Sequence, residues 1–346
     1  MNQTIVEIRN QYEALEKTLD LFDKSREALS AAWKKAAPKA LVFLGCGSSY
    51  MVSCSLRDAA GAMTDLPVYA FAAGDLWLNH ARYRRQLSGA MVVAVSRSGR
   101  TSEILHAADA LRADGVEFSL CSLIAAVETP LGQRSAISVE IPWAFDESVC
   151  QTRSVSNLYA AGLSLLAAFA GDGTLPAQLR KLAAEGPAYL RKAEPLMARI
   201  AREDWNKAVV LADGVCAGLA TEGALAFQEI SQLPGVQHHV LDVRHGPIVL
   251  VDEKTLVLVY LYPDGQPQQE ALIKDLQKKG AKVLVYSNLP REIPGAESIS
   301  LGADVDEAPG GIAFLNLCQL AAYEKSMETG SDPDAPTGLD AWIQVN

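Results

Sequence analysis

The chain has 346 residues, 49% apolar and 21% charged, which is the composition of an ordinary soluble globular protein with room for two domains. Its net charge of −10 is offset by no Lys/Arg-rich stripe, which argues against a nucleic-acid surface. No signal peptide or membrane-length apolar run is visible, and the cysteines and histidines show no metal-ligand spacing. We expect a cytoplasmic protein with reduced thiols, no metal or redox cofactor, and no nucleic-acid or membrane partner.

Apolar residues at helical spacing predict one amphipathic helix over residues 4–35. Two strand-forming runs follow, at 41–44 and 91–95, and each ends in a Gly/Ser loop before a predicted helix. A helix N-terminus favours phosphate, glycine lets the backbone come close, and short hydroxyls donate without bulk. Such residues also serve ordinary turns and N-caps, but two such loops together favour a phosphorylated small molecule. The residues predicted to contact its phosphate are Gly47, Ser48, Ser49, Ser96, Arg97, Ser98 and Thr101.

The second half of the chain echoes the first at an offset of about 166 residues, which predicts a duplicated βαβα unit. Near-continuous apolar strands alternating with helices imply parallel sheets covered on both faces. The clearest Gly/Pro break between the halves falls at 171–176. The predicted organisation is a helical segment at 1–35, α/β domains at 36–174 and 175–330, and an extended tail at 331–346.

The two copies are not equivalent. The second copy has Asp213 and Asp264 in the loops that correspond to the Gly/Ser loops, and the hydroxyls are gone. Because an aspartate repels phosphate, we expect only the first copy to bind it. The second copy instead carries a Glu-Ile-Ser motif at 229–231 and an Arg-His-Gly-Pro motif at 244–247.

Together with a Glu-Ser-Val-Cys-Gln-Thr stretch at 147–152, these motifs give the chain a resemblance to the sugar isomerase (SIS) domain family in its double-domain form. It resembles the isomerase half of glucosamine-6-phosphate synthase, the ketose/aldose-phosphate isomerase and aminosugar-phosphate deaminase branch, and the fructosamine-phosphate deglycases. The resemblance implies an α/β fold of two tandem SIS domains, each a flavodoxin-like three-layer sandwich with a parallel sheet between helices.

The resemblance also implies roles for single residues. The loop from Val149 to Thr152 would close on the sugar, Glu229 would move the proton between C1 and C2, and His245 would assist ring opening from the partner subunit of a homodimer with shared sites. A carboxylate beside apolar residues and an imidazole both suit such proton transfers. The residues alone leave Glu229 open to a solvent-facing role, His245 to plain polar surface, and Glu222 to either a second acid or a helix-stabilising group.

Two departures from the resembling synthase concern the ligand. Arg97 and Arg100 replace Gln and Glu, so they either add a bidentate contact to an anion or are solvated, paired with Glu103. The imine-forming lysine of the tail is absent, with Ala341 or its neighbour in its place.

The sequence thus predicts an enzyme, a phosphosugar aldose–ketose isomerase or an aminosugar-phosphate deaminase/isomerase. A fructosamine-phosphate deglycase is the alternative, and a non-catalytic phosphosugar sensor is an alternative of another class. The sequence does not identify the sugar or whether an amine is released.

Overall fold

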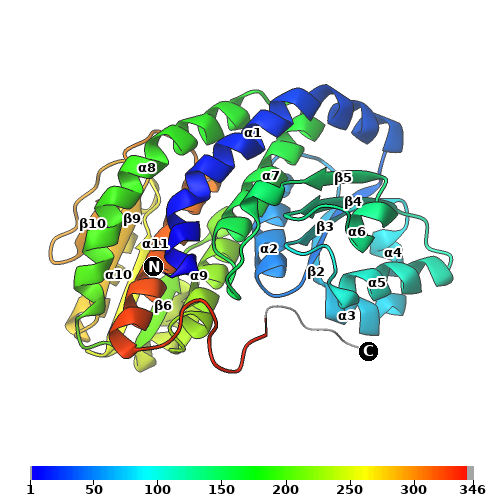
Figure 1. Cartoon of the computed structure of the whole chain (residues 1–346). Coiled ribbons are helices and arrows are strands. Elements are labelled where there is room, and N and C mark those ends of the chain that lie inside the picture. The colour runs from blue at the N-terminus through cyan, green and yellow to red at the C-terminus, as the bar shows by residue number, and fades with distance from the viewer. Residues whose placement is uncertain (1, 341–346) are drawn as a thin grey trace. The chain divides into compact units, whose positions relative to one another are not determined.

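The computed structural model describes residues 2–340, which form two compact units (Figure 1). The first-sheet unit comprises Glu13–Glu147 and Arg153–Arg180, together with Asp340. The second-sheet unit comprises residues 2–12, Ser148–Thr152 and Lys181–Leu339. The short stretch Ser148–Thr152 therefore groups with the second-sheet unit although the residues on either side of it belong to the first.

A five-stranded parallel sheet forms the centre of the first-sheet unit, with the strand order β2-β1-β3-β4-β5. Its strands are β1 (Ala40–Gly45), β2 (Val68–Ala72), β3 (Ala90–Ser96), β4 (Ser119–Ile124) and β5 (Ile137–Glu140). Its helices are α2 (Ser48–Gly61), α3 (Ala73–Leu78), α4 (His80–Leu87), α5 (Ser102–Ala113), α6 (Pro130–Arg134) and α7 (Arg153–Ala170), with a short 3₁₀ turn η1 (Pro142–Ala144).

Both faces of this sheet are buried, which explains the unbroken apolar runs of β1 and β3. Side chains alternate between the faces of a strand. Val42, Leu44 and Val92 therefore share one face, where they pack against apolar residues of α3, α5 and α6. On the other face α2 and α7 pack so closely that a Cβ on Gly162 would lie 2.4 Å from Leu56.

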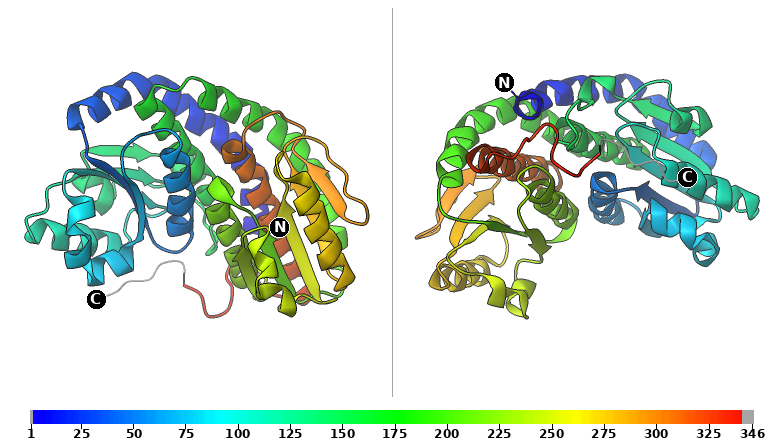
Figure 2. Two further views of the ribbon diagram at one scale, coloured as in Figure 1. Left: turned by 180° about the vertical axis from the view of Figure 1, so that it is seen from behind. Right: turned by 60° about the horizontal axis from the view of Figure 1, so that its bottom comes forward.

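The second-sheet unit repeats this arrangement, with the strand order β10-β9-β8-β6-β7. Figure 2 gives two further views of both sheets. The strands of the second sheet are β6 (Lys207–Leu211), β7 (Gly235–His238), β8 (Thr255–Tyr260), β9 (Lys282–Ser287) and β10 (Glu297–Ser300). Its helices are α9 (Ala217–Glu229), α10 (Gln266–Lys278) and α11 (Glu307–Thr329), with the short turns η2 (Gly214–Cys216), η3 (Asp242–Arg244) and η4 (Pro247–Leu250).

The two sheets have the same strand order. In each, the second strand in the chain lies at one edge beside the first strand, and the third, fourth and fifth strands follow on the other side of the first strand. In the second sheet, α10 packs its Leu272 and Leu276 against one face. Helices α9 and α11 pack together, with Gly223 against Cys318. The predicted α/β fold with two helix-flanked parallel sheets is therefore confirmed.

Two long helices contribute residues to both units, α1 (Gln3–Ala36) and α8 (Thr174–Ala201). Helix α1 is the helix expected over residues 4–35, and its apolar positions, such as Ile8 and Leu15, are buried. Residues 331–340 contain no helix or strand, in agreement with their prolines. Ala341, Trp342 and Ile343 lie outside the described residues. Within residues 2–340, no helix has the length and apolar character needed to cross a bilayer.

Candidate functional site

The two Gly/Ser loops lie next to each other at one edge of the first sheet. Strands β1 and β3 are parallel neighbours with Leu44 opposite Ala94, so the loops that follow them leave the sheet at the same edge. The chain turns to β2 on one side and to β4 on the other, so the strand order reverses between β1 and β3. Open α/β sheets bind ligands at such a switch point, outside the carboxyl ends of the strands.

The first loop is tight because it contains glycine where a side chain has no room. A Cβ on Gly45 would lie 2.5 Å from the backbone carbonyl of Ser49. Gly47 has a φ of +52°, which favours glycine. Ser48 and Ser49 begin α2 and are 4% and 5% exposed. In the part of the chain that the structure describes, no hydrogen bond involves either hydroxyl, so both are available to an anion at this helix N-terminus.

The second loop is braced from inside. The Ser96 hydroxyl accepts a hydrogen bond from the Gly99 N–H at 3.0 Å and is 3.1 Å from the Thr101 hydroxyl. Gly99 has a φ of +62°, and its carbonyl accepts the N–H of Leu131 at 3.1 Å. Ser98 is half-buried, and its hydroxyl accepts the N–H of Arg100 at 3.2 Å. The sequence predicted these hydroxyls as ligand contacts but gave no indication that Ser96 also holds the loop.

The two arginines of this loop have different environments. Arg97 is 7% exposed, and its guanidinium lies 5.8 Å from the ring centroid of Phe145. Arg100 is exposed. A solvated role, one of the two alternatives left open by the sequence, is therefore wrong for Arg97 and fits Arg100.

Cys46, in the first loop, is not an activated nucleophile. Burial, helped by the nearby Glu103 carboxylate, raises the pKa of the Cys46 thiol to about 11. The thiol is therefore protonated at neutral pH, whereas a nucleophilic cysteine needs a lowered pKa.

The corresponding edge of the second sheet is filled by the chain's own groups. The Tyr262 hydroxyl accepts the Asp213 N–H at 2.8 Å and donates to the Asp213 carbonyl at 2.7 Å. The Asp213 carboxylate accepts the N–H of Val240 and contacts Nδ1 of His239, both at 3.0 Å. Burial raises the pKa of Tyr262, which keeps the phenol neutral. At this end of the second sheet an anion would meet the Asp213 carboxylate, and the Asp213 N–H already donates to Tyr262.

The predicted base and its neighbour lie on α9 in the second-sheet unit. Glu229 is the last residue of this helix and is partly exposed. Glu222 lies two turns earlier and is only 2% exposed. The Ser231 hydroxyl donates to the Phe227 carbonyl at 2.8 Å, which closes the end of the helix beside Glu229. The burial of Glu222 makes it a second carboxylate to test.

His245 lies in the same unit, on the surface between η3 and η4. The neighbouring Arg244 pairs with Asp275 of α10 at 2.8 Å, which fixes the start of this loop. Val249 and Leu250, just beyond it, are 72% and 73% exposed. Two exposed apolar side chains therefore follow His245 closely in the chain.

The stretch Ser148–Thr152, which contains the predicted sugar contacts Val149 and Thr152, is held by other parts of the second-sheet unit. Thr152 is fully buried, and its carbonyl accepts the Gln319 side-chain amide at 3.1 Å. Ser148 hydrogen-bonds Glu7 of α1. Nothing in the sequence pointed to Glu7 and Gln319, because both occupy ordinary helical positions and only the fold brings them to this stretch.

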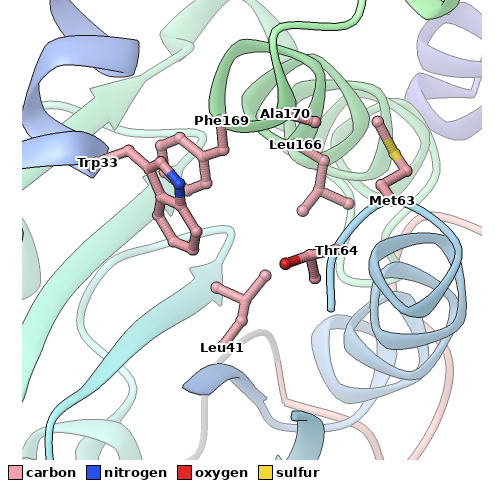
Figure 3. Close-up of a pocket in the computed structure, with 7 residues that line it drawn as sticks. All are labelled: Trp33, Leu41, Met63, Thr64, Leu166, Phe169 and Ala170. Atoms are coloured by element: carbon pink, nitrogen blue, oxygen red, sulfur yellow. The ribbon is translucent and has the colours of Figure 1, made fainter. Parts of the chain in front are cut away.

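A small apolar pocket in the first-sheet unit does not fit a phosphate (Figure 3). It encloses about 40 Å³ near Leu41, at the opposite end of β1 from the Gly/Ser loops. Trp33 and Phe169 stack on its wall at 4.4 Å between ring centroids. Among residues 2–340, no cluster of three or more His, Cys, Asp or Glu side chains could hold a metal ion.

Known proteins resemble this chain in sequence and in fold. The sequence profile of the SIS domain matches residues 36–170 and again residues 203–323. The chain belongs to the SIS domain family. Two curated relatives are glutamine–fructose-6-phosphate aminotransferases (isomerizing). That of Gluconobacter oxydans is 26% identical over 326 residues, which cover 88% of this chain and 52% of the relative. That of Caulobacter vibrioides is 26% identical over 359 residues, covering 98% and 58%. The SIS chain thus spans about half the length of these relatives.

Solved structures show the same fold. Glucosamine-6-phosphate deaminase from Thermotoga maritima aligns with a TM-score of 0.85 and 22% identity, covering 99% of this chain and 100% of that one. Tagatose-6-phosphate ketose/aldose isomerase from Escherichia coli aligns with a TM-score of 0.86 and 22% identity, covering 100% and 97%. At these identities the likeness establishes the fold.

Proposed function

We propose that this SIS protein is an enzyme that binds a phosphorylated hexose or hexosamine and moves a proton between its C1 and C2. The observation that carries the proposal is the pair of Gly/Ser loops at the switch point between β1 and β3. Two helix N-termini, of α2 and α5, begin at these loops, so backbone dipoles and hydroxyls converge on one place. The chain's net charge of −10 makes such local donors necessary for an anionic substrate.

In the proposed reaction the phosphate is held by the residues from Gly47 to Ser49 and from Ser96 to Thr101. Glu229 removes the proton from the carbon next to the sugar carbonyl and returns it to the neighbouring carbon. His245 moves a proton on the ring oxygen and opens the ring. Val149 and Thr152 contact the sugar. With an amine at C2, the same proton transfer gives an imine at C2, which water hydrolyses to the ketone and ammonia, and the reaction is then a deamination.

The test of the base uses two carboxylates on one helix. Glu229→Gln keeps the shape and removes the basicity, so turnover should fall by about 10²–10⁴-fold while sugar-phosphate binding survives. Glu222→Gln is the matched comparison, two turns away on α9. Full activity of Glu229→Gln would overturn the assignment, and a larger loss in Glu222→Gln would move the role to Glu222. The substrate is first found by a thermal-shift screen of hexose and hexosamine 6-phosphates.

The burial of Arg97 favours one second candidate, a deglycase that splits an amine conjugate of a sugar 6-phosphate. A guanidinium that is 7% exposed beside the phosphate loop can bind a carboxylate bidentately, and the amino-acid part of such a conjugate carries one. Arg97→Gln should then weaken binding of the conjugate more than binding of glucosamine 6-phosphate, because only the conjugate carries a carboxylate besides its phosphate. Equal effects on both ligands would remove the support for a deglycase.

A homodimer with shared sites is part of the proposal. Exposed Val249 and Leu250 need an apolar cover, and they lie beside His245, so a second copy would bury all three. Mixing Glu229→Gln with His245→Ala under subunit exchange should restore activity, because one hybrid site would be intact. A fully active monomer at nanomolar concentration would exclude shared sites.

The proposal also includes a duplicated domain and a cytoplasmic location. The identical strand order of the two sheets and the two family matches support duplication of one unit, with domains at 36–174 and 175–330. All six cysteines are free thiols, which supports a cytoplasmic location. Whether a fragment of residues 36–174 folds on its own tests the domain bounds, and cell fractionation tests the location.

A further inference from the structure

The segment after α11 returns to the beginning of the chain and caps α1 (Figure 1). One carboxylate oxygen of Asp334 accepts the Gln3 N–H at 2.8 Å. The other accepts the Thr4 N–H at 2.8 Å and the Thr4 hydroxyl at 2.7 Å. The first N–H groups of a helix have no partner within the helix, and a carboxylate there is favourable. The first turn of α1 contains no acidic residue, so Asp334 supplies the missing cap.

The same two elements hold the stretch Ser148–Thr152. The Asp334 carbonyl accepts the Val149 N–H at 3.0 Å. One turn along α1, the fully buried Glu7 accepts the Ser148 N–H at 3.3 Å and also the Ser148 hydroxyl. The Gln3 side-chain amide donates to Glu7 at 3.2 Å, which links the capped turn to this carboxylate. Asp334 thus contacts the stretch directly and also fixes the helix end that carries Glu7.

A second anchor fixes the segment further along. Gln232 lies three residues after Glu229, and its side-chain amide donates to the Thr337 carbonyl at 2.8 Å. Pro333 and Pro336 are buried on either side of Asp334 and restrict the backbone between the two anchors. Residues 333–337, here called the tail strap, therefore connect the start of α1, the stretch Ser148–Thr152 and the end of α9.

We propose that Asp334 is a positioning residue that holds the Ser148–Thr152 stretch in its ligand-binding conformation by docking the tail strap against α1. The proposal rests on the proposed function in one respect, the contact of Val149 and Thr152 with the sugar. Burial raises the pKa of Asp334, but the hydrogen bonds from Thr4, Gln3 and Asn2 outweigh it and leave the pKa below its ordinary value. The carboxylate is therefore charged at neutral pH, as the cap requires.

Hydrogen exchange of the whole chain tests the docking without any ligand. Asp334→Ala keeps the backbone carbonyl that binds Val149, so faster exchange there reports undocking of the strap and not removal of that acceptor. Amides of residues 3–7 and 148–152 should exchange at least about 10-fold faster. Asp172→Ala is the matched control, because Asp172 accepts the Thr174 N–H at 2.7 Å at the start of α8 and contacts no part of the stretch. It should leave residues 148–152 unchanged.

Unchanged exchange at residues 148–152 in Asp334→Ala would overturn the proposal. Uniformly faster exchange along the whole chain would do the same, because it would show a general loss of stability. If Asp334→Ala fails to fold, Asp334→Asn is used, since its amide oxygen still accepts one N–H. Its amides at 148–152 should exchange faster than those of the wild type, and wild-type exchange there would reject the role of the charge.

A ligand experiment separates positioning from phosphate binding. The Gly/Ser loops belong to the first-sheet unit, so Asp334→Ala should leave the Kd for inorganic phosphate unchanged. The Kd for a sugar phosphate that the wild type binds should rise about 5–20-fold, and KM should rise more than kcat falls. Equal weakening of phosphate and sugar phosphate would contradict positioning. If no sugar phosphate binds the wild type, the proposed function fails, and the exchange experiment still decides whether Asp334 holds the stretch.

Discussion

Replacing Gly99 with alanine should destabilise the protein more than the same change at Gly47, although both glycines lie in the Gly/Ser loops. Both have positive φ, +62° and +52°, and a residue other than glycine in such a sparsely populated region costs about 1–3 kcal/mol. A Cβ on Gly99 would also lie 2.4 Å from Oγ1 and 2.6 Å from Cβ of Thr129, whereas a Cβ on Gly47 meets nothing within 4 Å. Overpacking of this kind costs about 1–3 kcal/mol. We expect a loss of about 2–6 kcal/mol for Gly99→Ala and about 1–3 kcal/mol for Gly47→Ala.

Urea unfolding followed by circular dichroism measures both losses. The double variant Gly99→Ala/Thr129→Gly removes the clash, so its loss should be smaller than the sum of the two single losses, of which the Thr129→Gly loss includes the hydroxyl that caps α6 at the Gly132 N–H. The coupling between the two positions should exceed about 1 kcal/mol. Equal losses at Gly99 and Gly47, or no coupling to Thr129, would refute the reasoning that Thr129 fixes the second loop.

Three further measurements each test one residue. Ser98→Ala should weaken sugar-phosphate binding in calorimetry by about 1–3 kcal/mol, the cost of an unmade charge-assisted bond, and unchanged affinity would reject the site. Because the pKa of Cys46 is raised to about 11, its alkylation by iodoacetamide, followed by peptide mass spectrometry, should accelerate with pH up to that value; a plateau near pH 8 would contradict this. Lys325→Met should cost about 1–3 kcal/mol in urea unfolding, because Lys325 donates to the carbonyls of Ala201 and Glu203, both at 3.0 Å. Burial lowers the pKa of Lys325, so just below the ordinary lysine pKa the unfolded chain binds more protons than the folded chain. The wild type should therefore gain stability relative to the variant as pH rises toward 10.5.

Local features of the site could be predicted because they depend on residues close in sequence. A strand that ends in glycine and serine before an apolar helix pattern places hydroxyls at a helix N-terminus in any parallel α/β sheet. Ser48, the first residue of α2, and Thr101, the residue just before α5, were placed at helix N-termini in this way. Arg97 shows the limit, since nothing in its own loop indicates that Phe145 covers its guanidinium.

The sequence by itself determined the α/β class, the long N-terminal helix, the strands that precede the two Gly/Ser loops, and the replacement of those loops' hydroxyls by aspartate in the second copy, because these follow from periodicity and local residue type. Only the tertiary structure decided that Tyr262 fills the second switch point, that Thr129 restricts Gly99, and that Asp334 and Glu7 hold the stretch Ser148–Thr152. Each of these contacts joins residues far apart in the chain. Their side chains are of common types, and the sequence pattern sets which face of an element is buried but not which partner it meets there.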